Sequence, residues 1–361
     1  MGFNHLKTRL KRLQLKLTEH ELDAILVTDL INLAYISGFK GTAGKAVVTK
    51  QDAFLITDFR YTEQAKQQAK HFTVIQYEKN IENTLKEVIC QAKAEKVGFE
   101  KDIVTYEQYY KYKSTLSNIS LIPTKGMIAG LRKQKEADEL DKIRKAVSIG
   151  DKAFSNILKQ IKPGVSEEFI ALALEYDMRQ MGATSVSFDI IVASGHHSAL
   201  PHAKPSNKVL TAGDLVVFDF GCVYEGYCSD MTRTVGIGHL TEEKQKIYDT
   251  VLEAQQAVLQ KLKANMAAKD ADTVARKVIK QAGYGKYFGH GLGHGVGLQV
   301  HEAPRMSPLS EDVLLEDMVV TVEPGIYVPT IGGVRIEDMV RITKKGIENF
   351  TKSSKELIII R

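Results

Sequence analysis

The sequence predicts a two-domain protein, with an α/β domain in residues 1–126 followed by an α+β domain in residues 127–361. Three observations support this fold class. Helical and strand patterns alternate through the first domain, a long charged helical pattern follows it, and two β-hairpin patterns occupy much of residues 215–342. A chain of 361 residues also suits about two domains.

The N-terminal domain is predicted from its alternation of element types. Helices are expected at residues 6–17, 30–37, 62–70, 83–94 and 106–116. Strands are expected at residues 23–28, 46–49, 53–57, 72–77 and 97–100. This order is typical of an α/β domain.

The segment 126–154 marks the predicted domain boundary, because it opens with glycine and passes into a long charged helix. Two later helical patterns, residues 163–183 and 265–284, have similar lengths, and an aromatic residue and a strand follow each of them. They form a faint internal repeat within the second domain.

The first hairpin is predicted in residues 215–235, where two β-rich runs flank Tyr224-Glu225-Gly226. If the turn is centred between Tyr224 and Glu225, Asp219 and Asp230 are directly opposed. Opposed side chains of an antiparallel pair lie about 5 Å apart on one face. We therefore expect these two carboxylates to share a site.

The second hairpin is predicted in residues 318–342, whose strands flank the break at 329–333. A turn centred on Thr330 places Glu323 opposite Glu337. Arg335 lies two residues before Glu337, so the alternation of a strand directs both side chains to the same face. This hairpin supplies a second pair of carboxylates.

The two pairs predict a metal site. Buried like charges are strongly unfavourable unless something neutralises them, and two divalent cations would do so. The alternative is that these acids point to solvent from half-exposed strands. The glycine-rich run 287–304, which contains His290, His294 and His301, lies between the hairpins and favours the metal site. Oxygen-rich ligation with one imidazole suits manganese, cobalt, iron or zinc.

Five motifs in order resemble those of the pita-bread metallopeptidases, in the branch of aminopeptidase P and prolidase. They are VVFDFG, SDMTRT, HGLGHGVGLQVHE, VEPGIY and GGVRIED. The resemblance covers nearly the whole chain and implies a creatinase-type N-terminal domain before a pita-bread catalytic domain. It also implies that Asp219 binds one ion, that His294 and Glu323 bind the other, and that Asp230 and Glu337 bridge the two.

The resemblance also implies the catalytic residues. Glu323 would accept a proton from a metal-activated water and pass it to the leaving nitrogen, and Arg335 would hold a ligating carboxylate. His202 and His301 would contact the scissile carbonyl or the developing oxyanion. Alternatively, these two are ordinary surface histidines of proline-containing loops. His196 and His197 match no functional position, and no GxSxG or reactive-cysteine motif offers a covalent nucleophile.

The activity implied by the resemblance is metal-dependent hydrolysis of an N-terminal Xaa-Pro bond. The expected substrate is a peptide with proline at its second position. We expect two divalent ions, with manganese favoured over cobalt and zinc, and a homodimer. The alternatives are a prolidase restricted to Xaa-Pro dipeptides, a metal-free hydrolase of the creatinase kind and a non-catalytic binding module.

An aminopeptidase is favoured over a prolidase at this stage for two reasons. A prolidase needs a cation for the free carboxylate of the dipeptide, and Arg335, the nearest cation placed from the sequence, is committed to the metal carboxylates by strand parity. The strings GFKGTAG (38–44) and TDFRY (57–61) also resemble aminopeptidase P-like members. Alternatively, Asp58 and Arg60 of the second string pair locally and cap the following helix.

Composition excludes several other classes of function. The net charge is +5, but basic and acidic residues are interspersed, so no nucleic-acid-binding stripe is expected. The three cysteines, Cys90, Cys222 and Cys228, have no CxxC spacing, which favours a reducing compartment. The basic, amphipathic N-terminal segment does not resemble a signal peptide, and no apolar run reaches about 18 residues. We expect a cytoplasmic protein without membrane contact.

Overall fold

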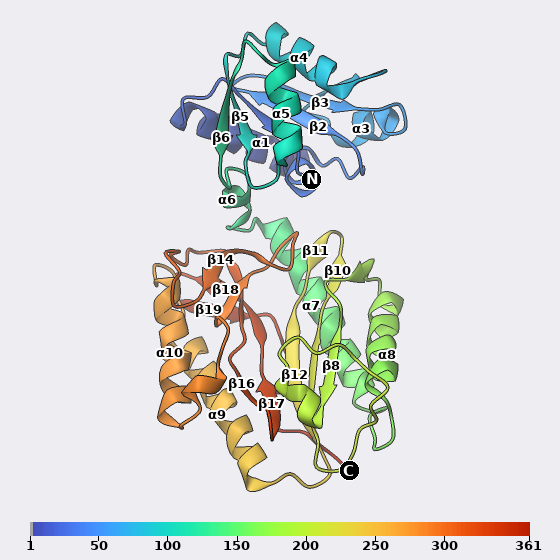
Figure 1. Ribbon diagram of the computed structural model, residues 1–361, viewed down its shortest axis with the longest axis vertical. Coiled ribbons are helices and arrows are strands. Elements are labelled where there is room, and N and C mark those ends of the chain that lie inside the picture. Colours follow the sequence, from blue (N-terminus) through green and yellow to red (C-terminus); the bar gives the residue numbers. More distant parts are fainter. Residues whose placement is uncertain (1–2) are drawn as a thin grey trace. The chain divides into compact units, whose positions relative to one another are not determined.

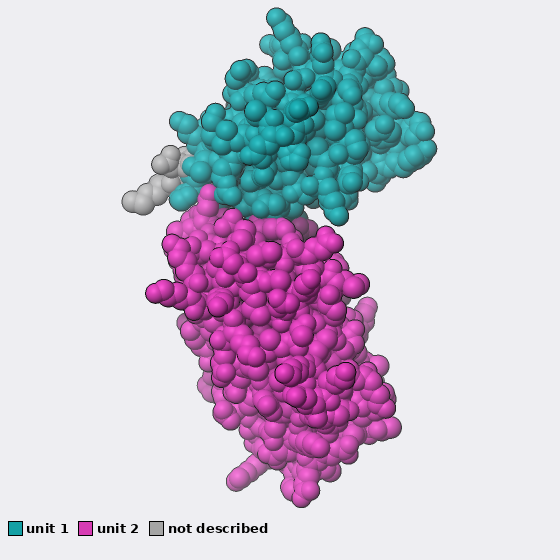
Figure 2. Space-filling view, turned by 90° about the vertical axis from the view of Figure 1, so that its left-hand side faces the viewer, with its two compact units in different colours: residues 1–132 teal, residues 133–361 magenta. Residues whose placement is uncertain are grey.

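The computed structural model describes residues 3–361. The chain divides into two compact units, residues 1–132 and residues 133–361 (Figure 2). The division falls within the segment 126–154, where the sequence changes from the α/β alternation to the charged helical pattern.

The N-terminal unit is built on a six-stranded mixed sheet with the order β4-β3-β2-β1-β5-β6 (Figure 1). β1 is antiparallel to β2, and β2 is antiparallel to β3, while the other neighbours are parallel. The strands are β1 Ala24–Val27, β2 Lys45–Thr49, β3 Ala53–Thr57, β4 Thr73–Gln76, β5 Lys96–Glu100 and β6 Ser120–Thr124. The helices are α1 Phe3–Glu19, α2 Leu30–Ser37, α3 Thr62–Gln68, α4 Ile81–Gln91, α5 Tyr106–Thr115 and α6 Ala129–Arg132.

The predicted α/β alternation of this unit is confirmed, with β6 as an additional strand. All four residues of β1 are buried, as expected for a central strand covered on both faces. β6 contains Pro123, which argues against a strand in sequence alone. Proline is tolerated there because β6 forms an edge of the sheet.

Asp58 and Arg60 form the local pair that the sequence allowed. Arg60 donates from Nε to Asp58 Oδ1 over 2.9 Å and from Nη2 to Asp58 Oδ2 over 2.8 Å. Neither residue caps the following helix, because the N-cap of α3 is Tyr61 and makes no side-chain capping bond. Within the N-terminal unit this motif is therefore a local ion pair.

The long charged helix predicted across residues 126–154 is two helices. α6 ends at Arg132, and α7 Ala137–Ile157 begins with a capping box formed by Glu136 and Glu139. The residues between them extend, because Gln134 forms a β-bridge with Met318 and Lys135 N donates to Asp317 O over 2.9 Å. Tertiary hydrogen bonds thus override a local helical preference.

The C-terminal unit consists of two halves, each of which combines two helices with a β-sheet (Figure 1). The first half joins α7 and α8 Glu167–Gln180 to a sheet of order β20-β12-β9-β8, and the second joins α9 Glu242–Leu259 and α10 Ala268–Gln281 to a sheet of order β14-β13-β15-β18-β19. The strands of these sheets are β8 Ile191–Ser194, β9 Leu215–Phe220, β12 Met231–Ile237, β13 Gly293–Gly295, β14 Glu302–Met306, β15 Val319–Val322, β18 Asp338–Thr343, β19 Gly346–Asn349 and β20 Ile359–Ile360.

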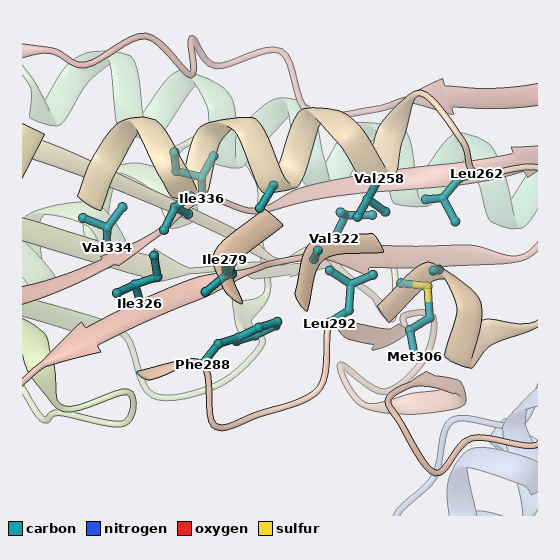
Figure 3. Close-up of a cluster of buried hydrophobic side chains, with 14 of the residues drawn as sticks. Val258, Leu262, Ile279, Phe288, Leu292, Met306, Val322, Ile326, Val334 and Ile336 are labelled. Atoms are coloured by element: carbon teal, nitrogen blue, oxygen red, sulfur yellow. The ribbon is translucent and has the colours of Figure 1, made fainter. Parts of the chain in front are cut away.

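Short elements complete this unit. They are β7 Ser185–Val186, β10 Cys222–Tyr224, β11 Tyr227–Cys228, β16 Gly325–Val328, β17 Gly332–Arg335 and the 3₁₀ segments η1 Gly195–Ala199 and η2 Gly285–Tyr287. Each half has its own apolar core. Val258 of α9, Ile279 of α10 and Val322 of β15 belong to the core of the second half (Figure 3).

The predicted register is wrong for the first hairpin and confirmed for the second. Asp219 pairs with Thr232, not with Asp230, because the turn lies at Glu225 and Gly226, whose φ angles of 48° and 90° suit a two-residue hairpin loop. The observed partner of Asp219 lies two residues after the predicted one. Because side chains alternate along a strand with a period of two, Asp219 and Asp230 still lie on the same face. In the second hairpin, Val322 pairs with Asp338 and Gly325 with Arg335, as expected for a turn at Thr330.

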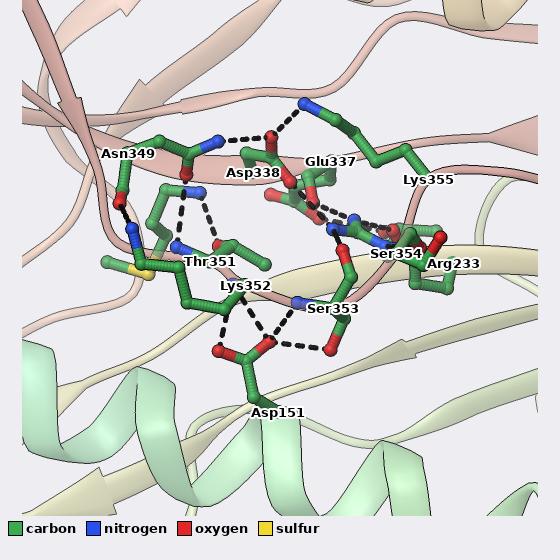
Figure 4. Close-up of polar contacts among 12 residues, drawn as sticks. Asp151, Arg233, Glu337, Asp338, Asn349, Thr351, Lys352, Ser353, Ser354 and Lys355 are labelled. Carbon is green, nitrogen blue, oxygen red and sulfur yellow. Dashed lines mark hydrogen bonds and ion pairs between the residues drawn. The ribbon is translucent and has the colours of Figure 1, made fainter.

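Arg233 of β12 ties the two halves together (Figure 4). Its guanidinium is only 1% exposed and forms an ion pair with Asp338, with 2.8 Å between Nη2 and Oδ1. It also donates to the backbone oxygens of Thr232, Glu337, Ser353 and Ser354. This buried arginine therefore joins β12 of the first half to the start of β18 and to the C-terminal segment.

None of the helices in residues 3–361 combines the length and the apolar character that crossing a membrane requires.

We predict that Arg233→Met destabilises the C-terminal unit by about 3–5 kcal/mol, because it leaves Asp338 buried without its main partner. Urea unfolding followed by circular dichroism measures the loss. Arg341→Met is the matched control, since its ion pair with Asp317 is partly exposed and should contribute about 1 kcal/mol or less. Equal losses for the two variants would contradict the role given to Arg233.

Candidate metal centre

The five predicted ligands meet at the junction of the two halves. Asp219 lies on β9, and Asp230 comes directly before β12, both in the first half. His294 lies on β13, Glu323 directly follows β15, and Glu337 directly precedes β18, all in the second half. Neither half could assemble the group without the other.

The distances within the group are short. One ligand atom from each of Asp230, His294 and Glu337 lies within 4.8 Å of the other two. His294 Nε2 is 3.3 Å from Glu323 Oε1 and 3.7 Å from Asp230 Oδ2. Asp219 acts electrostatically on both Asp230 and Glu337, so it belongs to the same group.

The residues present fit a group of cations. Asp219 Oδ1 and Glu337 Oε1 are buried and have no hydrogen-bond partner. Burial, followed by repulsion from neighbouring carboxylates, raises the pKa of Asp230 and Glu337 well above the usual range. Burial also raises the pKa of Asp219, although Arg335 opposes the shift. Bound divalent cations would satisfy the orphan oxygens and compensate the charge.

His294 directs its Nε2 atom towards the neighbouring carboxylates, where it could bind such a cation. Its Nδ1 donates to the carbonyl of Gly295 over 3.1 Å, which leaves Nε2 directed at Asp230 and Glu323. A backbone carbonyl commonly fixes the tautomer of a metal-binding histidine in this way. The carboxylate of Glu323 raises the pKa of His294 despite the opposing effect of burial, and a cation would replace the Nε2 proton.

The glycines around His294 allow close approach of strands. A Cβ atom on Gly293 would lie 2.2 Å from the carbonyl oxygen of Thr321, and one on Gly295 would lie 2.4 Å from that of Ala303. β13 is thus confined between β14 and β15, with glycine on either side of the ligand. The glycine-rich run is a half-buried strand at this point and not an open loop.

Arg335 holds the Asp219 carboxylate, as strand parity predicted. Its Nη2 donates to Asp219 Oδ2 over 2.6 Å, and its Nε donates to Thr232 Oγ1 over 3.0 Å. Thr232 in turn donates to Glu337 Oε2 over 2.7 Å. One arginine and one threonine therefore connect a carboxylate from each half.

Tyr327, His290, Thr232 and Thr321 also support the site, and none was identified from sequence. Tyr327 accepts a hydrogen bond from Arg335 over 2.6 Å and donates to His290 Nε2 over 3.0 Å. Thr321 Oγ1 donates to Glu323 over 3.1 Å and accepts from His294 N. The two threonines share strand parity with neighbouring ligands, and that parity is the signal that could have identified them.

His301 and His202 lie beside the predicted ligands, since the carbonyl of Pro201, next to His202, accepts a hydrogen bond from Arg335. The ring of His301 is 4.4 Å from that of His294, and both His301 and His202 are exposed. Partial removal of its ring from water, followed by the charge of His294, lowers the pKa of His301, and His202 contributes to the same shift. The structure thus places both histidines next to the proposed ligands with their side chains accessible to solvent.

The residues on either side of the His202 segment are hydrogen-bonded to the buried carboxylate of Glu167. Glu167, at the start of α8, is fully buried and accepts hydrogen bonds from the backbone and side chain of Ser194 and of Ser206. His197 Nδ1 donates to the same carboxylate over 3.3 Å. His197 therefore helps to fix η1 through Glu167.

Two protein-family models match the chain in the order of its two units. The model for the Creatinase/Prolidase N-terminal domain matches residues 9–134, and the model for metallopeptidase family M24 matches residues 141–344. They confirm the predicted fold class and the predicted family resemblance.

Four similar proteins match this chain over almost their full lengths. An uncharacterized peptidase of Bacillus subtilis is 45% identical over 94% of this chain and 96% of its own, and an Xaa-Pro dipeptidase of Pyrococcus furiosus is 40% identical over 98% and 100%. An Xaa-Pro dipeptidase structure from Bacillus anthracis has a TM-score of 0.96 at 45% identity, covering 98% of this chain and 100% of its own. An X-Pro aminopeptidase structure from Thermotoga maritima has a TM-score of 0.88 at 39% identity, covering 94% and 98%.

We predict that the metal-free protein becomes more stable as the pH is lowered from about 7.5 to about 5.5. The pKa values of Asp219, Asp230 and Glu337 are raised in the folded state, so folding retains protons that the unfolded chain releases. The raised pKa of His294 acts in the same direction, because its stabilisation is lost as pH rises through the folded value. The lowered pKa values of His290 and His301 act in the opposite direction in this window, but they are fewer than the four groups with raised values. The lowered pKa of Glu323 matters only below this window.

Thermal unfolding of chelator-treated and metal-loaded protein across this pH range tests the prediction. Chelation should lower the melting temperature most at the higher pH, where the buried charge is uncompensated. The double variant Asp230→Asn/Glu337→Gln is the control, since without metal it should lose most of the pH dependence. The same pH dependence with and without metal would refute the account.

Proposed function

The chain belongs to metallopeptidase family M24 and is a hydrolase, and from that premise we propose that it is an Xaa-Pro dipeptidase. Its substrate would be a dipeptide with proline at the second position, cleaved at the Xaa-Pro bond. Relatives named Xaa-Pro dipeptidase, similar over nearly their whole lengths, support this activity over the aminopeptidase that the sequence favoured. The X-Pro aminopeptidase of Thermotoga maritima keeps the latter as the second candidate.

One structural observation carries the catalytic part of the proposal. Five side chains from two half-domains converge, and two of their buried carboxylate oxygens have no partner. In a non-catalytic binding module or a metal-free hydrolase, these buried acids would destabilise the fold without a cation to compensate them. Both alternatives are therefore disfavoured.

Divalent cations would be held by Asp219, Asp230, His294, Glu323 and Glu337. In our proposal Asp219 would help to hold one ion, His294 and Glu323 would help to hold the other, and Asp230 and Glu337 would supply further carboxylate oxygens. Manganese is the proposed metal, because four carboxylates and one imidazole form a hard, oxygen-rich donor set, with cobalt and zinc as alternatives. Metal analysis of protein purified without added metal identifies the ion.

When bound, a pair of divalent ions supplies Lewis acidity that activates a water molecule and polarises a peptide carbonyl. Glu323 is the proposed general base. Its carboxylate lies 3.3 Å from His294 Nε2, and the positive charge of nearby cations would keep it ionised and able to accept a proton. Glu323 would then deliver that proton to the proline nitrogen as the bond breaks.

His301 and His202 would act on the substrate carbonyl. Both are exposed beside the centre, where an imidazole N–H can donate to the oxygen that gains negative charge during attack. Arg335 would keep Asp219 in place, because its guanidinium is already bound to that carboxylate and to Tyr327. These are the roles that we propose for the chain's own residues.

We also propose a homodimer and a cytoplasmic location. Cys90, Cys222 and Cys228 are all free thiols, which suits a reducing compartment. Light scattering of the purified protein measures the oligomeric state directly.

We predict that His301→Ala and His202→Ala keep their bound metal but lose about 10²–10³-fold in kcat, as expected when a donor to the developing oxyanion is removed. His294→Ala is the comparison, because removing a proposed ligand should lower the metal content itself. Metal analysis together with steady-state kinetics separates the two effects. A metal loss in His301→Ala equal to that in His294→Ala would reverse our assignment of roles.

We predict that Ala-Pro has a kcat/KM at least about tenfold higher than that of Ala-Pro-Ala, a difference of about 1.4 kcal/mol in transition-state binding. Release of free alanine from each peptide under identical conditions measures the ratio. A clear preference for the tripeptide would favour the aminopeptidase and leave the proposed metal centre unchanged.

A further inference from the structure

A glycine-rich segment leads to the proposed ligand His294. Every second residue from 289 to 295 is glycine. Glycine loses more conformational freedom on folding than any other residue, so the path of this backbone depends on hydrogen bonds from outside the segment. Two side chains of α10, a helix that lies outside the five motifs of the metal centre, supply several of these bonds.

Asp272 and Arg276, one helical turn apart on α10, form an ion pair with two hydrogen bonds. Arg276 donates from Nε to Asp272 Oδ2 over 2.6 Å and from Nη2 to Asp272 Oδ1 over 3.1 Å. Asp272 is fully buried, and the guanidinium lies over the ring of Phe288 at 4.3 Å from its centroid. Two simultaneous bonds between the charged groups fix the orientation of both side chains.

The same two side chains hold the backbone of the glycine-rich segment. Arg276 donates to the carbonyl oxygen of Phe288 over 2.9 Å and also to that of His290. Asp272 Oδ1 accepts a hydrogen bond from the backbone N of Leu292 over 3.1 Å. One ion pair therefore fixes three alternate residues of the segment directly before His294.

Leu292 extends this connection to a second proposed ligand. Its carbonyl oxygen accepts a hydrogen bond from the backbone N of Glu323 over 2.9 Å, and it lies two residues before His294. Leu292 is buried in the same apolar core as Ile279 of α10 (Figure 3). The ion pair on α10 is thus joined through one buried residue to both side chains that would hold the same ion.

We propose that Asp272 and Arg276 are positioning residues for His294 and Glu323, although neither would touch the ion or the substrate. The inference rests on the metal centre of the proposed function. Residues behind the ligands of a metal commonly fix their orientation, and changing them weakens metal binding. Loss of the ion pair would release Leu292, so the ion held by His294 and Glu323 would bind more weakly and Glu323 would be less well placed to accept a proton.

α8 of the other half carries a comparable ion pair that supplies a matched control. Arg179 donates from Nε to Glu175 Oε1 over 2.9 Å and from Nη1 to the carbonyl oxygen of Thr184 over 2.9 Å. Like the pair on α10, it spans one helical turn and reaches the backbone that follows. Its side chains are exposed, and Thr184 donates to Val223 of β10 and not to a proposed ligand.

The test replaces each arginine with lysine, in Arg276→Lys and Arg179→Lys. Lysine keeps the charge beside the carboxylate, but it lacks the planar set of donors that reaches a carboxylate and two carbonyl oxygens at once. Manganese is titrated into chelator-treated protein by calorimetry, and kcat and KM are measured with Ala-Pro. Arg276→Lys should weaken the binding of one manganese ion by about 10- to 100-fold and lower kcat about tenfold, with KM changed less than about twofold. Arg179→Lys should change each quantity by less than about twofold.

Asp272→Asn is the second variant, because it weakens the same ion pair from the carboxylate side and should give the same loss of manganese affinity. Wild-type manganese affinity in Arg276→Lys would overturn the proposal even if the melting temperature of the metal-free protein falls, since the pair would then be only structural. Equal losses of affinity in Arg276→Lys and Arg179→Lys would also overturn it. A wild-type protein that binds no divalent ion would instead refute the metal centre itself, so the two failures are distinguishable.

Discussion

The burial of four carboxylates beside one imidazole is the constraint on which the rest of the C-terminal unit depends. Burial and mutual repulsion raise the pKa values of Asp219, Asp230 and Glu337, and two of their oxygens have no protein partner. Such a group is stable only when cations or protons compensate it. The same feature that destabilises the protein without metal therefore gives the site its capacity for hydrolytic chemistry.

The junction of the two halves is organised to hold this group rigidly. Thr232 bonds to Glu337, and Arg335 bonds to both Thr232 and Asp219, so ligands from separate sheets share partners. Behind them, the buried pair of Arg233 and Asp338 joins the same strands to the C-terminal segment (Figure 4). Polar contacts at this depth are costly when incomplete, and here they fix the relative position of the half-domains.

The metal centre alone does not decide whether the substrate is a dipeptide or a longer peptide. The chain is similar over nearly its whole length both to an Xaa-Pro dipeptidase and to an X-Pro aminopeptidase, so this overall similarity does not distinguish the two activities.

The sequence by itself determined the α/β alternation of the N-terminal unit, the second hairpin and the chemistry of the five predicted ligands. Periodicity, turn residues and residue type are local properties, so they can be read along the chain. It did not determine the register of the first hairpin, where Glu225 and Gly226 moved the turn, or the break between α6 and α7, where Gln134 pairs with Met318. Tertiary structure also decided the roles of Tyr327 and Glu167, because each depends on hydrogen-bond partners distant in the chain.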